Sequence, residues 1–196
     1  DPLAHDYQRV TGRYYVYDRF VQLGCPSESK KLAEYASEDS FNAAVDQATA
    51  RVTGATYHDI GMLWGLRFIS RNGFFAADNP TTRNNIVVNQ HIIFMTDGKL
   101  ETGPSVYSAY GVEGVQDRAV GASSLNRFHI SRFESACNVA KSLGVTVWVI
   151  ALDVSDIEDI RSCATTDENF YISDGSDLEE VFAEIGNGIG YLRLTR

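Results

Sequence analysis

The chain has few basic residues, and this shortage limits the partners that it can attract. It carries 17 lysine and arginine residues against 26 aspartate and glutamate residues, a formal net charge of -9 at pH 7. An acidic surface gives phosphate backbones and anionic lipids no reason to approach, so nucleic-acid binding is disfavoured. The chain also lacks a run of about 20 apolar residues, the length that a membrane-spanning helix needs. We therefore expect a soluble domain that does not itself enter a membrane.

Motifs for common hydrolytic chemistry are missing as well. The four histidines, at positions 5, 58, 91 and 129, are too far apart for the helical spacing of paired metal ligands. No Gly-x-Ser-x-Gly motif occurs, and Cys25 precedes a proline without an oxyanion-hole glycine motif after it. We interpret His58 as a polar residue in the first turn of a helix and His91 as structural. The sequence predicts a protein that is not an enzyme; the alternative is a metal-dependent or thiol hydrolase, which needs a convergent cluster of such residues.

Length and composition predict one domain of ordinary size. The chain has 196 residues, of which 44% are hydrophobic and 11% aromatic, enough to bury a sizeable core. We expect a single domain over residues 1–196. Because the chain starts at Asp1 without a methionine and without a basic-then-apolar signal pattern, we also expect a cleavage boundary there, with further sequence upstream.

Hydrophobic periodicity predicts that helices and strands alternate along the chain. Strands are expected at residues 13–23, 91–96, 145–152 and 169–173. Helices are expected at residues 38–53, 56–70, 128–143, 157–163 and 178–192. Periodicity places Ile60, Leu63, Trp64 and Phe68 on one face of the second helix. The third helix is marked by Phe128, Ala136, Val139, Ala140 and Leu143. The polar, asparagine-rich stretch 73–89 is predicted to be a loop.

Two of these strands, 91–96 and 145–152, are almost wholly apolar, and helical patterns flank both. Such strands are typical of a parallel sheet that is covered on both faces. We therefore predict an α/β fold: a doubly wound, mostly parallel sheet with helices on both faces. The irregular connection 99–124 is long enough to be a binding surface or a small inserted subdomain.

Asp97 directly follows strand 91–96, and Gly98 frees the backbone to turn. In parallel α/β sheets, ligands bind beyond the carboxyl ends of the strands. Asp97 is therefore predicted either to coordinate a cation or to hold an Asp-Gly turn. Thr56 begins a helix with Asp59 at the spacing of a capping box, so its hydroxyl has a structural interpretation beside any role in a site.

The Thr-Asp-Gly turn after this strand, together with the earlier Gly-Ala-Thr turn that opens a helix, resembles the von Willebrand factor A (vWA) domain. Longer stretches are similar to the carboxyl-terminal part of the TadG proteins of bacterial Tad/Flp pilus assembly: TYHDIGMLWGLRFIS, HIIFMTDG, YSAYGVEGVQDR, GVTVWVIAL, SCAT and YLRLTR. The resemblance runs from about Cys25 to the end of the chain. It implies a vWA or Rossmann-like fold and a noncatalytic cell-envelope module for adhesion or protein binding. It also implies export to the periplasm or surface of a bacterium, behind an upstream membrane anchor.

The metal ion-dependent adhesion site of that family uses an Asp-x-Ser-x-Ser loop, a threonine and an aspartate. Thr56 and Asp97 match the last two ligands. The loop has no match, because the only similar stretch, DVSDI at 153–157, follows a late strand and ends in isoleucine. One carboxylate and one hydroxyl make a poor Mg²⁺ site. The resemblance therefore implies Mg²⁺ binding that is weak or absent, with an acidic side chain of a protein partner completing the metal's shell.

The missing loop follows the first strand of the family's sheet, so the resemblance also implies that this chain lacks that strand. In the strand order 3-2-1-4-5-6 the first strand lies between the second and the fourth, and its loss leaves unpaired edges. We expect the gap to be filled by residues 1–12, by a second copy of the chain, or by a retained upstream fragment. Protein partners of the pilus or envelope are expected in addition.

Three cysteines, Cys25, Cys137 and Cys163, fit either buried thiols or one disulfide with an odd partner. An exported protein meets oxidising conditions. Cys137 lies in a helix that leads into strand 145–152, and Cys163 follows that strand closely. Together with the family likeness this favours a Cys137–Cys163 disulfide over the two pairings with Cys25, while two buried thiols remain an alternative.

Overall fold

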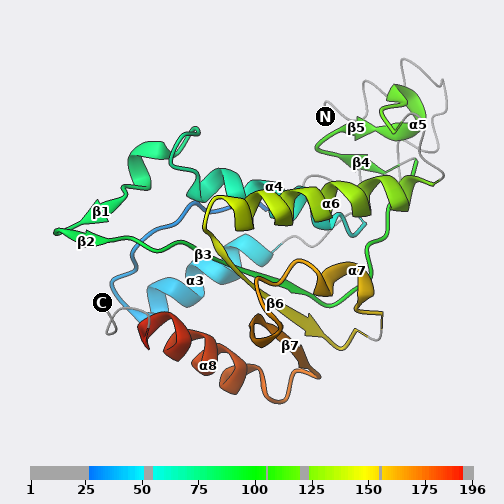
Figure 1. The fold of residues 1–196 in the computed structure, drawn as a ribbon. Coiled ribbons are helices and arrows are strands. Elements are labelled where there is room, and N and C mark those ends of the chain that lie inside the picture. Colours follow the sequence, from blue (N-terminus) through cyan, green and yellow to red (C-terminus); the bar gives the residue numbers. More distant parts are fainter. Residues whose placement is uncertain (1–26, 51–54, 105, 120–123, 155, 192–196) are drawn as a thin grey trace. The chain divides into compact units, whose positions relative to one another are not determined.

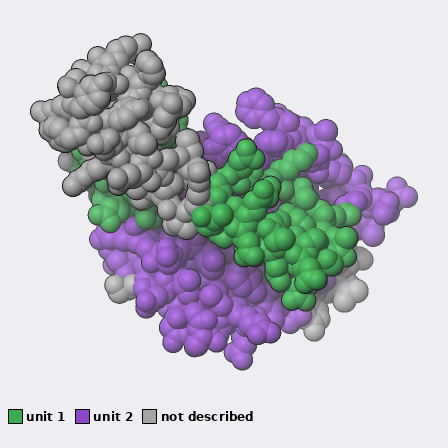
Figure 2. Space-filling view, turned by 180° about the vertical axis from the view of Figure 1, so that it is seen from behind, with its two compact units in different colours: residues 1–57, 101–128 green, residues 58–100, 129–196 purple. Residues whose placement is uncertain are grey.

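The computed structural model describes residues 27–50, 55–104, 106–119, 124–154 and 156–191 (Figure 1). The strand predicted at 13–23, Cys25 and the end of the helix predicted at 38–53 fall wholly or partly outside these ranges. The chain divides into two compact units, which Figure 2 shows in different colours. The first comprises residues 1–57 and 101–128, and the second comprises residues 58–100 and 129–196.

The second unit contains a three-stranded parallel sheet with the order β3-β6-β7. Its strands are β3 (His91–Thr96), β6 (Thr146–Leu152) and β7 (Phe170–Ser173). In the register, His91 lies opposite Thr146 and Val149 lies opposite Phe170. These strands confirm the sequence prediction at all three places, and their direction confirms a parallel α/β sheet.

Helices cover both faces of this sheet, as predicted (Figure 1). The central strand β6 alternates in side: Val147 and Val149 pack toward α4 (His58–Ile69) and α6 (Leu125–Ser142), whereas Trp148 and Ile150 pack toward α8 (Leu178–Tyr191). The short helix α7 (Glu158–Arg161) joins the first core through Ile160. Among the described helices, none has both the length and the apolar composition to cross a membrane.

The apolar residues that mark α4 and α6 in the sequence coincide only in part with the buried ones. In α4 the buried side chains are His58, Asp59, Met62 and Leu66, whereas Trp64 is 38% exposed. Two residues of the apolar set, Trp64 and Phe68, pack against each other, and Phe68 also packs against Phe75. In α6 the buried side chains are His129, Phe133, Cys137 and Ala140, whereas Val139 and Leu143 are exposed. The apolar sets and the buried sets differ because two histidines, His58 and His129, and Asp59 occupy part of the buried surface of these helices.

The expectation that strand 91–96 is covered on both faces is also wrong, although it holds for β6. Ile93 is 40% exposed and Met95 is 48% exposed, whereas the neighbouring Thr96 is buried. Among the described residues β3 pairs with β6 alone, so it is an edge strand.

The stretch predicted as a loop at 73–89 contains a short hairpin. A 3-10 turn, η1 (Ala76–Asp78), precedes the antiparallel strands β1 (Thr82–Arg83) and β2 (Ile86–Val87). Asn84 and Asn85 connect these strands with φ angles of 53° and 64°. Positive φ at both central residues is the requirement of a two-residue type I′ turn, and asparagine adopts it readily.

The first unit contains α3 (Glu38–Thr49), which starts with a capping box. The Ser40 amide donates to the Ser37 hydroxyl, and the Ser37 amide donates to the Ser40 hydroxyl. The irregular stretch 99–124 includes a small antiparallel hairpin, β4 (Tyr107–Ser108) and β5 (Gly111–Val112), followed by α5 (Glu113–Gln116). Part of this predicted loop is therefore ordered structure.

Candidate functional site

An aspartate follows each strand of the parallel sheet at its carboxyl end. Asp97 follows β3, Asp153 follows β6 and Asp174 follows β7, and all three are exposed. Asp153 adopts a left-handed φ of 52°, and its amide donates to the Ser173 carbonyl. Because parallel strands end at one edge, these acids mark the edge at which α/β sheets bind ligands.

Asp97 lies in a turn directly after β3, as the Asp97-Gly98 pair predicts. Thr96 fixes this turn, because its hydroxyl donates to the Gly98 carbonyl at 3.0 Å and accepts from the Gly98 amide at 3.3 Å. The Asp97 side chain is exposed beside this anchored backbone. The arrangement offers one carboxylate to a cation or to a basic partner.

Thr56, the second predicted metal ligand, lies in the first unit. Its amide donates to the Glu101 carbonyl and its carbonyl accepts from the Glu101 amide, which makes an isolated antiparallel bridge. This pairing contradicts the capping box proposed for Thr56 and Asp59, because the Thr56 amide is already bonded and α4 begins at His58. Thr56 and Asp97 belong to different units, so their joint metal site stays a prediction.

Two buried polar residues open α4, where the sequence suggested a solvated first turn. The His58 ring is 4% exposed, and its Nε2 lies 3.1 Å from the Thr96 hydroxyl oxygen. Since the Thr96 hydroxyl donates to Gly98, His58 is the donor in this contact. Burial lowers the pKa of His58 below its ordinary value, so the neutral ring is favoured. His58 thereby holds the turn that carries Asp97.

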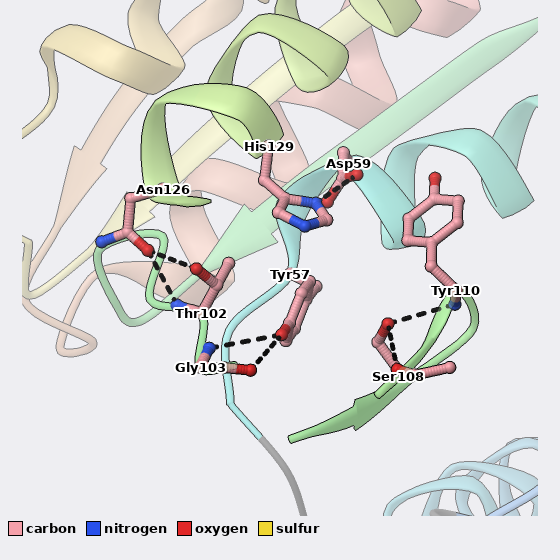
Figure 3. Close-up of polar contacts among 9 residues, drawn as sticks. Tyr57, Asp59, Thr102, Gly103, Ser108, Tyr110, Asn126 and His129 are labelled. Atoms are coloured by element: carbon pink, nitrogen blue, oxygen red, sulfur yellow. Dashed lines mark hydrogen bonds and ion pairs between the residues drawn. The ribbon is translucent and has the colours of Figure 1, made fainter. Parts of the chain in front are cut away.

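The adjacent Asp59 forms a buried hydrogen-bonded pair with His129 (Figure 3). Nδ1 of His129 donates to Oδ2 of Asp59 over 2.8 Å, and the two side chains are 4% and 1% exposed. This pair ties the start of α4 to α6. Sequence reasoning missed it because the two residues are 70 positions apart.

A usable signal did exist in the helix around His129. His129, Phe133, Cys137 and Ala140 recur at the spacing of one helix face, and all four are buried. A histidine on an otherwise apolar face must find a polar partner, because an unpaired buried polar group is costly. The pattern therefore predicts a buried acid or hydroxyl nearby, although it does not name Asp59.

Polar contacts in the first unit surround residues 102 and 103, at the start of the long connection (Figure 3). The Asn126 side-chain oxygen accepts from the Thr102 amide at 3.0 Å and from the Thr102 hydroxyl at 2.5 Å. The Tyr57 hydroxyl donates to the Gly103 carbonyl at 3.4 Å. These bonds fix the two ends of segment 101–128, which the sequence marked only as irregular.

Cys137 and Cys163 form a disulfide in the second unit. Their Cα atoms are 5.0 Å apart, and the two side chains are 1% and 0% exposed. The bond joins α6 to the turn after α7, and both cysteines belong to the core cluster that includes Val147 and Val149 of β6. This is the pairing that the sequence analysis favoured. Cys25 lies outside the described residues.

The described residues contain no group of three or more His, Cys, Asp or Glu side chains placed to hold one metal ion. Comparisons of the chain with protein-family models, with curated proteins and with solved structures found no match.

Proposed function

We propose that this chain is a noncatalytic cell-envelope module of Tad/Flp pilus assembly, which binds a protein partner through an incomplete vWA-type site. The observation that carries the proposal is the position of Asp97. It is exposed, it follows the carboxyl end of a parallel strand, and the His58–Thr96–Gly98 bonds hold its turn. Those are the properties that a ligand-binding aspartate of an α/β sheet needs.

The sheet supports a doubly wound, vWA-like fold that lacks its first strand. The order β3-β6-β7 is compatible with the fourth, fifth and sixth strands of the order 3-2-1-4-5-6. In that order the first strand lies beside the fourth, which is the side of β3 that has no partner among the described residues. We propose that the strand is supplied by residues 1–12, which lie outside the described residues, by a second copy of the chain, or by a retained upstream fragment.

The Cys137–Cys163 disulfide supports export to the periplasm or cell surface, because such bonds persist in oxidising compartments. Mg²⁺ would bind weakly or not at all at Asp97, with an acidic side chain of the partner completing the shell. The alternative function, a hydrolase, is favoured by the Asp59–His129 pair alone. That pair is buried, and two of the three cysteines are joined in the disulfide, so the noncatalytic function has the better support.

The test uses the bacterium that encodes the full-length protein. Asp97→Ala is compared with Glu134→Gln, which removes the same charge from an exposed position of α6. We expect Asp97→Ala to lower adhesion and pilus number while Glu134→Gln leaves both unchanged. A strain without the protein that assembles normal pili and adheres normally would overturn the proposal.

The strand partner is tested by mass. The chain alone is 21.7 kDa. If another polypeptide supplies the strand, we expect a native mass above this value. The denaturing mass then either stays at 21.7 kDa, for a second copy, or shows an additional species, for a retained fragment. One 21.7 kDa species under both conditions would show that no other polypeptide supplies the strand.

A further inference from the structure

A cavity of about 210 Å³ lies in the second unit, at the amino-terminal end of the strands. Gln90 and Val145, which directly precede β3 and β6, contribute to it together with the end of α4. This is the opposite end of the sheet from Asp97. The cavity is therefore separate from the proposed adhesion site, and a ligand bound there would not depend on the proposed role in pilus assembly.

The cavity has an apolar wall and one cation. Leu66, Ile69, Leu143 and Val145 form the apolar part of the lining. Among the described lining residues, Arg71 is the one charged side chain, beside the uncharged Ser70, Asn72 and Gln90. None of these lining residues carries a carboxylate, although the chain as a whole has a net charge of -9. The lining thus suits a molecule with one negative charge and an apolar part.

Arg71 has an unused hydrogen-bond donor. Its Nη2 donates to the Val88 carbonyl at 2.5 Å, which ties the end of α4 to the segment before β3. Its Nε is buried and has no hydrogen-bond partner within the described part of the chain. A guanidinium stays charged at all ordinary pH values, and a buried donor without an acceptor is costly. An anionic acceptor would remove that cost.

The amide groups nearby already have partners and do not supply this acceptor. The Gln90 side-chain nitrogen donates to the Ile69 carbonyl at 2.5 Å, and the Asn79 side-chain nitrogen donates to the Phe68 carbonyl at 2.8 Å. Both bonds satisfy carbonyl groups at the end of α4. The lining is therefore ordered before a ligand arrives, as is usual for small-molecule sites.

We propose that this cavity binds a small monocarboxylate with a short apolar tail. The carboxylate pairs with the guanidinium group of Arg71, and the tail packs against Leu66, Ile69 and Val145. Planar guanidinium and carboxylate groups match in geometry and charge. The volume is below the roughly 300 Å³ at which pockets for drug-sized molecules begin, so the tail has only a few carbons. A phosphate dianion fits less well, because it would face a single cation and an apolar wall.

The proposal is tested by titrating the full chain with sodium hexanoate while recording the NMR signal of the Arg71 Nε–H group and the heat of binding. We expect saturable binding that shifts this signal. Sodium acetate, which lacks the tail, and 1-hexanol, which lacks the charge, should each bind about tenfold more weakly or worse. Equal binding of hexanoate and hexanol, or of hexanoate and inorganic phosphate, would overturn the proposal.

Variants at Leu143 keep the test independent of folding, because this side chain is 60% exposed and lines the cavity. Leu143→Glu adds a negative charge to the lining of the cavity, so hexanoate affinity should fall by about tenfold. Leu143→Gln has the same shape without the charge and should lose clearly less. Arg71→Lys keeps the charge but removes Nε–H, and it should also weaken binding. Unchanged hexanoate affinity in both Leu143→Glu and Arg71→Lys contradicts the assignment.

Discussion

His129 Nδ1 lies 2.8 Å from Asp59 Oδ2, and both side chains are buried. This contact joins α4 and α6 on the same face of the parallel sheet. Next to it, His58 bonds to Thr96 and so connects the start of α4 to the end of β3. The polar cluster of His58, Asp59, Thr96 and His129 therefore fixes the framework around the Asp97 turn, although none of its members is exposed.

Removing the Asp59 carboxylate should destabilise the second unit strongly. Asp59→Ala removes the carboxylate that accepts the Nδ1–H bond of buried His129, and losing a buried hydrogen-bond partner in this way costs up to about 3 kcal/mol. Asp59→Asn retains an acceptor for the Nδ1–H bond, so its loss should be smaller, about 1 kcal/mol. Urea unfolding measures both changes.

The control for charge is Glu134→Gln, which removes an exposed carboxylate from α6. Exposed substitutions of this kind change stability by about 0.5 kcal/mol or less. If Asp59→Ala also stays within that limit, the buried pair does not stabilise the fold in the way that its geometry indicates.

His58 should make stability depend on pH near neutrality. Burial lowers the pKa of His58 below 6.5, so the unfolded chain takes up this proton at a higher pH than the folded chain does. The stability contributed by the neutral ring is present in full above pH 6.5 and is lost as the pH falls through the folded pKa. Unfolding free energy should therefore decrease on acidification below this value.

The matched variant for this prediction is His58→Gln, whose side-chain N–H can still donate to Thr96 but does not titrate. The other charges near His58, on Asp59 and Asp159, are unchanged in it. Wild type should lose more stability than His58→Gln between about pH 7.5 and pH 5.5, the range in which histidine titrates. Parallel pH profiles of the two proteins contradict the assignment.

Strand and helix positions in the second unit could be predicted because each pattern is locally strong. Strand 91–96 is an apolar run ended by Asp-Gly, and it matches β3 residue for residue. Gly144, with a φ of 76°, follows the end of α6 as the glycine signal predicts. The buried faces could not be predicted from hydrophobicity, because the sheet-facing surfaces of α4 and α6 include polar residues that become acceptable only when they pair.

The candidate site was predictable to a smaller extent. Asp97 could be found from its place after a strand, because parallel sheets bind ligands at that end. The role of His58 could not be found, since its partner Thr96 is 38 positions away. The Thr56–Asp59 spacing suggested a capping box, but spacing does not show that Glu101 has already bonded the Thr56 amide. Long-range pairs decide these roles, and a local pattern contains no information on them.

The disulfide should contribute measurably to stability. It closes a loop with a sequence separation of 26, which stabilises the folded state by about 3 kcal/mol in the chain-entropy description. Replacing Cys137 and Cys163 together by alanine should lower the free energy of unfolding by that amount. A reductant should lower the stability of wild type toward that of the double variant and leave the variant unchanged. Equal stability of wild type with and without reductant, once mass shows the thiols free, would contradict this.

The outer edge of β3 has backbone groups that can pair with another strand. The Thr146 amide donates to the Gln90 carbonyl, and His91 lies opposite Thr146. In a parallel ladder the groups of alternate residues face one neighbour, so the N–H and C=O groups of Ile93 face away from β6. Among the described residues nothing pairs with Ile93 on that side.

Proline substitution distinguishes a free edge from a paired one. If a further strand pairs with β3, as proposed above, Ile93→Pro removes a ladder bond and should destabilise the protein by about 3 kcal/mol. Ile93→Ala shortens the side chain but keeps the N–H, and should cost clearly less. Phe94→Pro breaks the β3–β6 ladder in either case, so it shows how much stability the loss of a ladder bond costs in this sheet. Since a free edge tolerates proline, equal stability of Ile93→Pro and Ile93→Ala would mean that no strand pairs there, and the missing-strand proposal would be wrong.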